Sequence, residues 1–171
     1  NNIENKGKLI LTSDGTTDVL EEKVYSTGET IIDGIIKANA GNIATTKTTI
    51  NSGKILKLTK GTAAADGILG GHVVGAGTLQ VTEDVEAFAD YVDADHNIVD
   101  SGKILTLTEG TVTTGGTIKK DITGAGQVTI KAGADAAHKN EIYANAMINT
   151  SKLLIKNYGV LYIDVDCLGK N

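Results

Sequence analysis

The sequence predicts an all-β chain that folds as a right-handed parallel β-solenoid (β-helix) of about seven coils with short edge insertions. Three observations lead to this fold class. A stretch of sequence recurs at a fixed spacing, the apolar residues are nearly all aliphatic, and glycine is abundant while proline is absent. The 171 residues include 21 Gly, no Pro, no Trp and one Phe. Glycine therefore has to make the turns, and thin layers of Ile, Val, Leu and Ala have to make the core.

The repeat is the strongest of these observations. Residues 49–62 (TINSGKILKLTKGT) recur as residues 98–111 (IVDSGKILTLTEGT), an offset of 98 − 49 = 49 residues. The same offset relates GAGTLQV at 75–81 to GAGQVTI at 124–130 without a gap. Two ungapped matches at one offset are difficult to obtain by chance, so the chain is built from repeats.

The copies divide a single solenoid domain, residues 1–171, into units near 3–48, 49–97, 98–146 and 147–171. A third copy begins at Met147, and a weaker copy, three residues out of step, lies at 5–12. Each unit is expected to hold two coils, because strand-like stretches at Ile104 and Gln127 are 127 − 104 = 23 residues apart.

Alternation along the expected strands separates inside from outside. Side chains on a strand point to opposite faces in turn, so Leu56, Leu58, Leu105 and Leu107 are predicted to point into the core and Thr106 to face solvent. The Gly-Lys pair before each strand and the Gly-Thr pair after it are expected at the corners, where the chain bends from one side of the solenoid to the next.

Two stretches depart from this pattern and are predicted to be insertions that project from one edge of the rod. Residues 82–97 place four apolar residues at helical spacing, beginning at Val85. The Ala-rich residues 132–146 are expected to form a second short helix or excursion. Insertions on one side of a solenoid commonly carry its contacts.

Composition and charge narrow the function classes. The formal net charge is −5 and all 16 basic residues are Lys, so the chain lacks the basic face and arginine forks of nucleic-acid binders. The single Cys167 excludes an internal disulfide framework and a cysteine-rich zinc site. No apolar run approaches the roughly 20 residues that span a bilayer, so this segment is expected not to cross a membrane. The chain starts with Asn1 and shows no signal peptide, which indicates an excised or processed segment.

The repeated phrases also resemble those of a known class of proteins. SGKILTLT at 101–108 and GAGQVTI at 124–130 are similar to the glycine–apolar–threonine phrases of bacterial autotransporter passenger domains and related repetitive surface adhesins. This resemblance implies a right-handed parallel β-helix, an extracellular or bacterial cell-surface location, and a role in adhesion or aggregation.

One stretch carries a candidate metal site. Asp93, Asp95 and Asn97 match the opening Asp-x-Asp-x-Asn of a calcium loop, in which alternating oxygens converge on one ion. The match ends there, because Ile98 stands where the loop needs glycine and Ile104 where it needs a bidentate glutamate. A solvated acidic loop is therefore the first expectation, and weak calcium binding is the alternative, because the surrounding unneutralised carboxylates attract divalent ions. Calcium is the one cofactor that the sequence suggests.

No catalytic constellation emerges from the sequence, and an enzyme is not expected. The histidines His72, His96 and His138 are isolated and occupy different repeat positions, as surface histidines do. The Gly-x-Gly phrases at 75–77 and 124–126 lack the third glycine and the following helix of a dinucleotide site, so they are expected to be corner turns.

The function expected from these patterns is that of a structural or adhesive solenoid of the bacterial cell surface, which mediates adhesion or self-assembly. Its expected partners are a host receptor, a glycan or identical chains joined end to end, and not nucleic acid. The alternative is a glycan-binding or glycan-cleaving solenoid module, such as a phage tailspike-like domain. Exposed aromatic side chains distinguish the two, because sugars stack on them, and the chain offers Tyr25, Tyr91, Tyr143, Tyr158 and Tyr162.

The two ends of the predicted rod are strand edges. Residues 9–11 form the first edge, and residues 161–163 with Val165 form the last. Neither stretch contains Pro and few charges flank them, so both edges are poorly protected against pairing. Head-to-tail contact does not close on itself, so filaments are expected unless further chain caps the ends.

Overall fold

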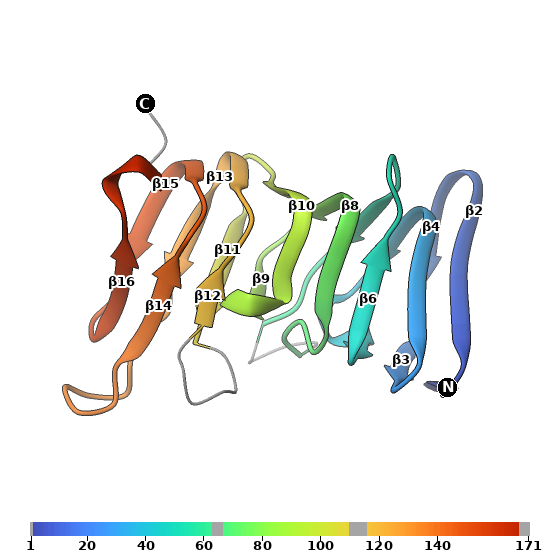
Figure 1. Ribbon diagram of the computed structural model, residues 1–171, viewed down its shortest axis with the longest axis horizontal. Coiled ribbons are helices and arrows are strands. Elements are labelled where there is room, and N and C mark those ends of the chain that lie inside the picture. Colours follow the sequence, from blue (N-terminus) through green and yellow to red (C-terminus); the bar gives the residue numbers. More distant parts are fainter. Residues whose placement is uncertain (1, 63–66, 110–115, 168–171) are drawn as a thin grey trace.

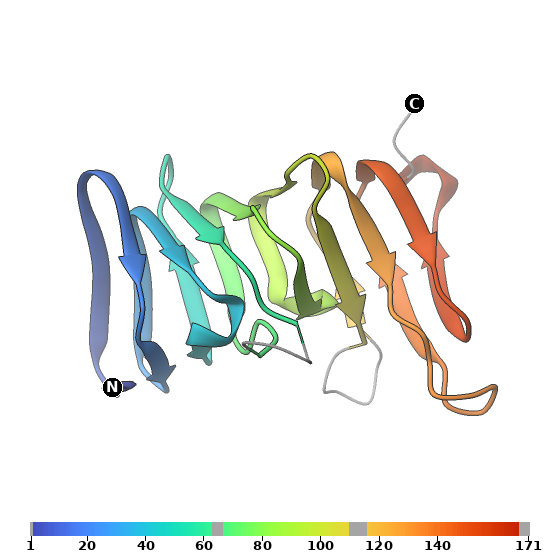
Figure 2. The same ribbon diagram turned by 180° about the vertical axis from the view of Figure 1, so that it is seen from behind.

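The computed structural model confirms the predicted fold class. It describes residues 2–62, 67–109 and 116–167. Parallel strands stack as a nearly all-β solenoid of about 7 turns, and the first and last strands lie at opposite ends of the rod (Figure 1). In Figure 1 the chain climbs the near side and descends the far side while it advances from right to left, which makes the solenoid right-handed. Figure 2 shows the descending strands from behind.

Each turn has a first, a second and a third side. The first side carries β1 (Asn2–Asn5), β3 (Lys23–Ser26), β5 (Ile43–Thr45), β9 (Val85–Phe88) and β11 (Ile104–Thr108). The second side carries β6 (Lys47–Ile50), β12 (Gly116–Ile118), β14 (Asn140–Ala144) and β16 (Gly159–Ile163), and the third carries β7 (Ile55–Leu58). The strands that bend from the second side to the third are β2 (Lys8–Leu20), β4 (Glu29–Ala38), β8 (His72–Val81) and β10 (Val92–Val99). Two further strands bend from the third side to the first, β13 (Ile122–Ile130) and β15 (Ile148–Ile155). Short 3-10 helices are η1 (Ala40–Asn42), η2 (Ala89–Tyr91) and η3 (Val165–Cys167).

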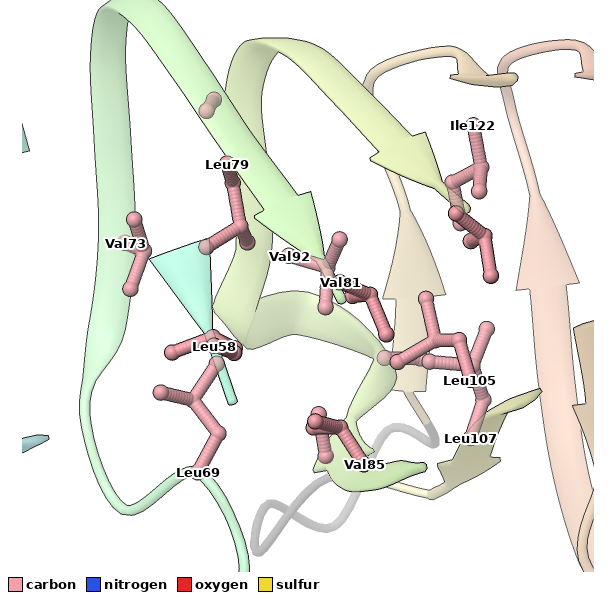
Figure 3. Close-up of a cluster of buried hydrophobic side chains, with 14 of the residues drawn as sticks. Leu58, Leu69, Val73, Leu79, Val81, Val85, Val92, Leu105, Leu107 and Ile122 are labelled. Carbon is pink, nitrogen blue, oxygen red and sulfur yellow. The ribbon is translucent and has the colours of Figure 1, made fainter. Parts of the chain in front are cut away.

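Inward aliphatic side chains form one core that runs the length of the rod. Strand pairing sets one residue of each turn beside its counterpart in the next, and on the third side this file is Ile36, Leu56, Leu79, Asn97, Ile122 and Ile148. All but Asn97 are aliphatic and buried. Figure 3 shows residues of the same core, such as Leu79 and Leu105, directed inward from different strands.

The predicted alternation is confirmed at the four leucines of the repeat. Leu56, Leu58, Leu105 and Leu107 are each at most 1% exposed, and Thr106 between the last two is partly exposed. Because each leucine stacks on an inward residue of the neighbouring turn, the core consists of aliphatic files and needs no large aromatic side chain.

Glycines make the sharp bends within the long strands, as the sequence predicted for corners. Gly75 in β8 has φ 110° and Gly124 in β13 has φ 117°, a region that favours glycine. A Cβ on Gly124 would lie 2.3 Å from the carbonyl oxygen of Val99 in the turn below, so no other residue fits this bend without a shift of the backbone.

The repeat does not follow the turns in the way the sequence suggested. Leu105 is the equivalent of Leu56 in the repeat, 105 − 56 = 49 residues later. Two full turns after Leu56, however, the position on the third side is occupied by Asn97. Leu105 lies on the first side of the next turn, so this interval covers more than two turns.

The next interval covers two turns in 153 − 105 = 48 residues, because Leu105 pairs with Val128 and Val128 pairs with Leu153. Leu154, the equivalent of Leu105 at 49 residues, lies in the file of Thr106 and Thr129 instead. The expectation of two coils per unit is therefore wrong for the first interval, and it holds for the second only with a shift of one residue.

The predicted insertion at residues 82–97 is wrong. This stretch forms β9, η2 and part of β10 in line with the solenoid, and Val85 and Val92 are each 1% exposed in the core. The apolar spacing that resembled a helix arises because a strand, a corner and a second strand each turn one apolar residue inward. Of residues 132–146, the part before β14 is a loop that projects below the rod in Figure 1, and the remainder includes β14 rather than a helix.

No helical segment in the described parts of the chain is long and apolar enough to span a membrane.

Candidate functional site

A groove of about 850 Å³ crosses the outer surface of the first side near the N-terminal end of the rod. It is lined by Asn2, Glu4, Asn5, Lys6, Tyr25, Ser26, Thr27, Ala44, Thr45, Thr46, Gly70 and Tyr91. The lining combines two tyrosines, small residues, and a rim of hydroxyl, amide and charged groups.

Small outward-facing residues form the floor. Tyr25 on β3 pairs with Ala44 on β5, and Gly70 lies against Ala44 from the following turn, where a Cβ on Gly70 would be 3.5 Å from the Ala44 Cα. Across successive turns the outward side chain therefore becomes smaller, from Tyr to Ala to Gly. The surface beside Tyr25 is hollowed because Ala44 and Gly70 contribute no side chain larger than a methyl group.

Tyr91 closes the far end of the groove and is held by its neighbours. Its ring packs edge-on against Phe88, with the centroids 5.2 Å apart, and stacks on the His72 imidazole at 6.1 Å. The His72 Nε2 lies 3.0 Å from the Asp93 Oδ2, which fixes the imidazole in turn. The Tyr91 ring is therefore positioned before any ligand arrives.

Tyr25 closes the near end and is 44% exposed. The Lys23 ammonium lies 4.9 Å from the Tyr25 ring centroid but does not line the groove, so it orients the ring from outside. On the rim, the side chains of Glu4, Lys6 and Thr27 make no hydrogen bond or ion pair with any residue that the structure describes. These groups are available to a ligand.

Asn5 lines the groove but serves the fold. Its Nδ2 donates to the Ser26 Oγ and to the Glu29 carbonyl oxygen, each at 2.9 Å, and its Oδ1 accepts from the Gly7 N–H at 3.0 Å. These bonds fix the corner between the first and second sides. We therefore assign Asn5 to the wall of the groove and not to ligand recognition.

The candidate calcium ligands all lie on β10, and the structure does not bring them together. Asp93 faces His72, whereas the Asp95 Oδ1 lies 2.7 Å from the Lys120 Nζ. The hydrogen bond and the charge of Lys120 lower the pKa of Asp95. Each carboxylate thus has a separate partner.

Asn97 is removed further from the other two, because it is 2% exposed inside the core. A register shift between Ala94 and His96 breaks the alternation and turns Asn97 inward. Its Nδ2 donates to the carbonyl oxygens of Ala94 at 2.8 Å and Asp121 at 3.1 Å. Within the described ranges no group of three or more His, Cys, Asp and Glu is placed to hold a metal ion.

The remaining histidines do not form a shared site. His138 Nδ1 lies 2.9 Å from the Asp135 Oδ1 in the projecting loop, and the hydrogen bond from His138 is the main cause of the lowered pKa of Asp135. This loop and Glu109 line a polar cavity of about 350 Å³. His96 is exposed on β10.

Two other tyrosines stack on each other near the C-terminal end. The rings of Tyr143 on β14 and Tyr162 on β16 are 4.6 Å apart and inclined by 12°. Each ring covers a face of the other, so this pair offers a ligand less aromatic surface than two separate rings would. Tyr158 is 50% exposed at a turn with φ 59°.

Sequence reasoning named Tyr25 and Tyr91 as aromatic candidates but did not place them in one site. It did not single out Ala44 or Gly70, because a small residue on a strand carries no signal of its own. Only the strand register shows that these residues follow Tyr25 on the same outward file.

No protein-family model matches this chain, and no curated protein and no solved structure matches it. Because these comparisons found no match, the resemblance of the repeated segments to those of autotransporter passenger domains supports a proposal and not an assignment. The groove, the core and the two ends of the rod supply the arguments for function.

Proposed function

We propose that this chain is a structural and adhesive solenoid of the bacterial cell surface, that it associates end to end, and that it has no catalytic role. The observation that carries the proposal is a core that reaches both ends of the rod without a cover from any residue that the structure describes. The similarity of its repeated phrases to those of autotransporter passenger domains supports the cell-surface location.

Inward residues of the terminal turns are partly exposed, whereas their partners one turn further in are buried. Leu11 on β2 pairs with Ile32, and Leu161 on β16 pairs with Ile142, and both of these isoleucines are 0% exposed. Leu11 and Leu161 are only partly buried. Since β2 and β16 are also the outermost strands of their sheets, each end presents apolar side chains beside backbone groups that have no strand partner in the described part of the chain.

The two ends are complementary in register. When β2 of one copy is laid on β16 of another as the next parallel strand, Leu11 lies on Ile163 in the core. On the outer face, Ile10 (48% exposed) lies on Tyr162 (45% exposed). Apolar groups thus meet on both faces of the joint, and the head-to-tail geometry leads to filaments.

Sedimentation velocity over a wide range of concentrations tests this association. We expect the average mass of the wild-type chain to rise with concentration. Leu11→Lys and Ile163→Lys place a charge at the inner position of each edge and should abolish the rise. Ile10→Lys places a charge on the outer face of the same joint and should also weaken the association. Ile98→Lys is the matched control, because Ile98 lies on β10 in the interior of the rod, between Gln80 and Thr123 and away from both ends, and is partly exposed.

Circular dichroism of each variant establishes that the solenoid is intact. A wild-type chain that remains monomeric at every concentration, with both inner variants behaving identically to it, would contradict end-to-end association.

The glycan-cleaving alternative finds little support at the groove. Glycoside hydrolysis generally uses a pair of carboxyl groups on either side of the scissile bond. Glu4 is the sole carboxylate among the described residues that line the groove. We therefore retain binding and not cleavage as the chemistry of this surface.

A further inference from the structure

We infer that the groove on the first side binds a neutral oligosaccharide about three sugar units long, with one unit on Tyr25 and another on Tyr91. This inference rests on the adhesive part of the proposed function and gives it a ligand class. It does not depend on end-to-end association.

The length of the ligand follows from the spacing of the turns. Tyr25, Ala44, Gly70 and Tyr91 come from successive turns of the rod. Stacked strands are about 4.8 Å apart, so the two tyrosines are separated by roughly 14 Å along the axis. An extended ligand, not a single small ring, is needed to contact both.

The chemistry of the lining matches a sugar. A sugar ring has an apolar C–H face and an edge of hydroxyl groups, which suit the apolar ring and polar tip of a tyrosine. Tyr25 is exposed, and Tyr91 is partly buried but lines the groove with the part of its side chain that faces it. Ala44 and Gly70 on the floor carry at most a methyl group, which leaves room for a ring between the tyrosines. Along the rim, Thr27 and Thr46 place hydroxyl groups beside the groove.

The charge of the groove favours a neutral ligand. Its lining holds one acidic residue, Glu4, and one basic residue, Lys6. These charges oppose each other, and the chain has no Arg to grip a phosphate or carboxylate in bidentate fashion. A strongly acidic polymer or a phosphorylated ligand would gain little attraction here.

A proline-rich peptide is the other occupant that aromatic grooves accept. Such a peptide docks its prolines between closely spaced aromatic rings. Tyr25 and Tyr91 stand at opposite ends of the groove, and Phe88 and His72 beside Tyr91 do not line it, so each end presents one ring to the ligand, which suits one sugar on each ring better.

Calorimetric titration with maltotriose, cellotriose and triacetylchitotriose tests the inference, with a proline-rich decapeptide as the competing occupant. We expect at least one trisaccharide to bind. Tyr25→Ala removes one stacking ring, and Ala44→Tyr fills the floor from an outward strand position. Each should weaken binding about tenfold or more. Tyr143→Ala is the matched control, since Tyr143 is 39% exposed and Tyr25 44%, and Tyr143 lies on β14, outside both the groove and the proposed joint. It should change the affinity less than about twofold.

The titrations are repeated in the Ile163→Lys background, whose substitution lies at the opposite end of the rod from the groove. Binding that persists there while association is lost supports the groove independently of assembly. Association without trisaccharide binding overturns the groove inference and leaves assembly standing. Equal losses for Tyr143→Ala and Tyr25→Ala, or binding of the peptide alone, also overturn it.

Discussion

At the scale of single residues, alternation along each strand determines the effect of a substitution. Leu107 is 0% exposed and pairs with Ile130 on the next turn, so its removal leaves a cavity in the core. Leu107→Ala should cost about 2–5 kcal/mol, whereas Thr106→Ala, on the outward face, should cost less than about 0.5 kcal/mol. Urea unfolding followed by circular dichroism measures both. Equal losses would mean that the assignment of inner and outer faces is incorrect.

A second residue-scale effect concerns the tyrosine pair near the C-terminal end. The negative charge of Glu141 is the main cause that raises the pKa of Tyr162, because it disfavours the phenolate. The folded chain therefore holds the phenol proton more tightly than the unfolded chain does. The free energy of unfolding is undiminished below the pKa of tyrosine in the unfolded chain, about 10, and it falls as pH rises through the pKa of the folded chain.

Glu141→Gln should therefore shift the Tyr162 titration to lower pH, as followed by phenolate absorbance. Glu4→Gln, at the other end of the rod, serves as the control and should leave this titration unchanged. A Tyr162 titration that is the same in wild type and Glu141→Gln would show that the two groups do not interact.

At the scale of the element, the bend within β13 depends on one glycine. Gly124 combines φ 117° with a position where a Cβ would meet the Val99 carbonyl oxygen. Gly124→Ala should destabilise the fold by about 2 kcal/mol or more, since backbone strain and overpacking add. Gly7→Ala is the control, because nothing lies within 4 Å of a Cβ there, and it should change stability by about 0.5 kcal/mol or less. Thermal melts compare them, and similar melting temperatures would contradict the clash.

At the scale of the whole molecule, the rod is a stack in which each turn pairs its strands with those of its neighbours. Among the described residues, an interior turn is covered on both sides, whereas each terminal turn is covered on one. This asymmetry is the physical basis of the proposed end-to-end association, because a second copy covers the partly exposed leucines.

Association of this kind has a structural signature. With about 7 turns per chain at about 4.8 Å each, filaments should show an axial repeat of roughly 35 Å together with the strand spacing itself. Electron microscopy and fibre diffraction measure the two spacings. Lateral aggregates without the longer repeat would contradict head-to-tail joining.

The sequence by itself determined the fold class, the strand-forming stretches and the direction of their side chains. Leu105 and Leu107 could be assigned to the core because alternation is a local property that strand geometry reads directly. The corner role of Gly75 and Gly124 was also predictable, since a glycine between two apolar stretches marks a bend. These features depend only on neighbours along the chain.

Only the tertiary structure decided which side of the rod each repeat occupies and where a groove forms. The interval from Leu56 to Leu105 turns further around the axis than the interval that follows, because the second interval spends residues on a projecting loop. Likewise, Tyr25 and Tyr91 border one groove because the register of the intervening turns sets small residues between them. Packing between turns sets the number of residues that project from the rod at each corner. A pattern of neighbouring residues in the sequence does not contain this number.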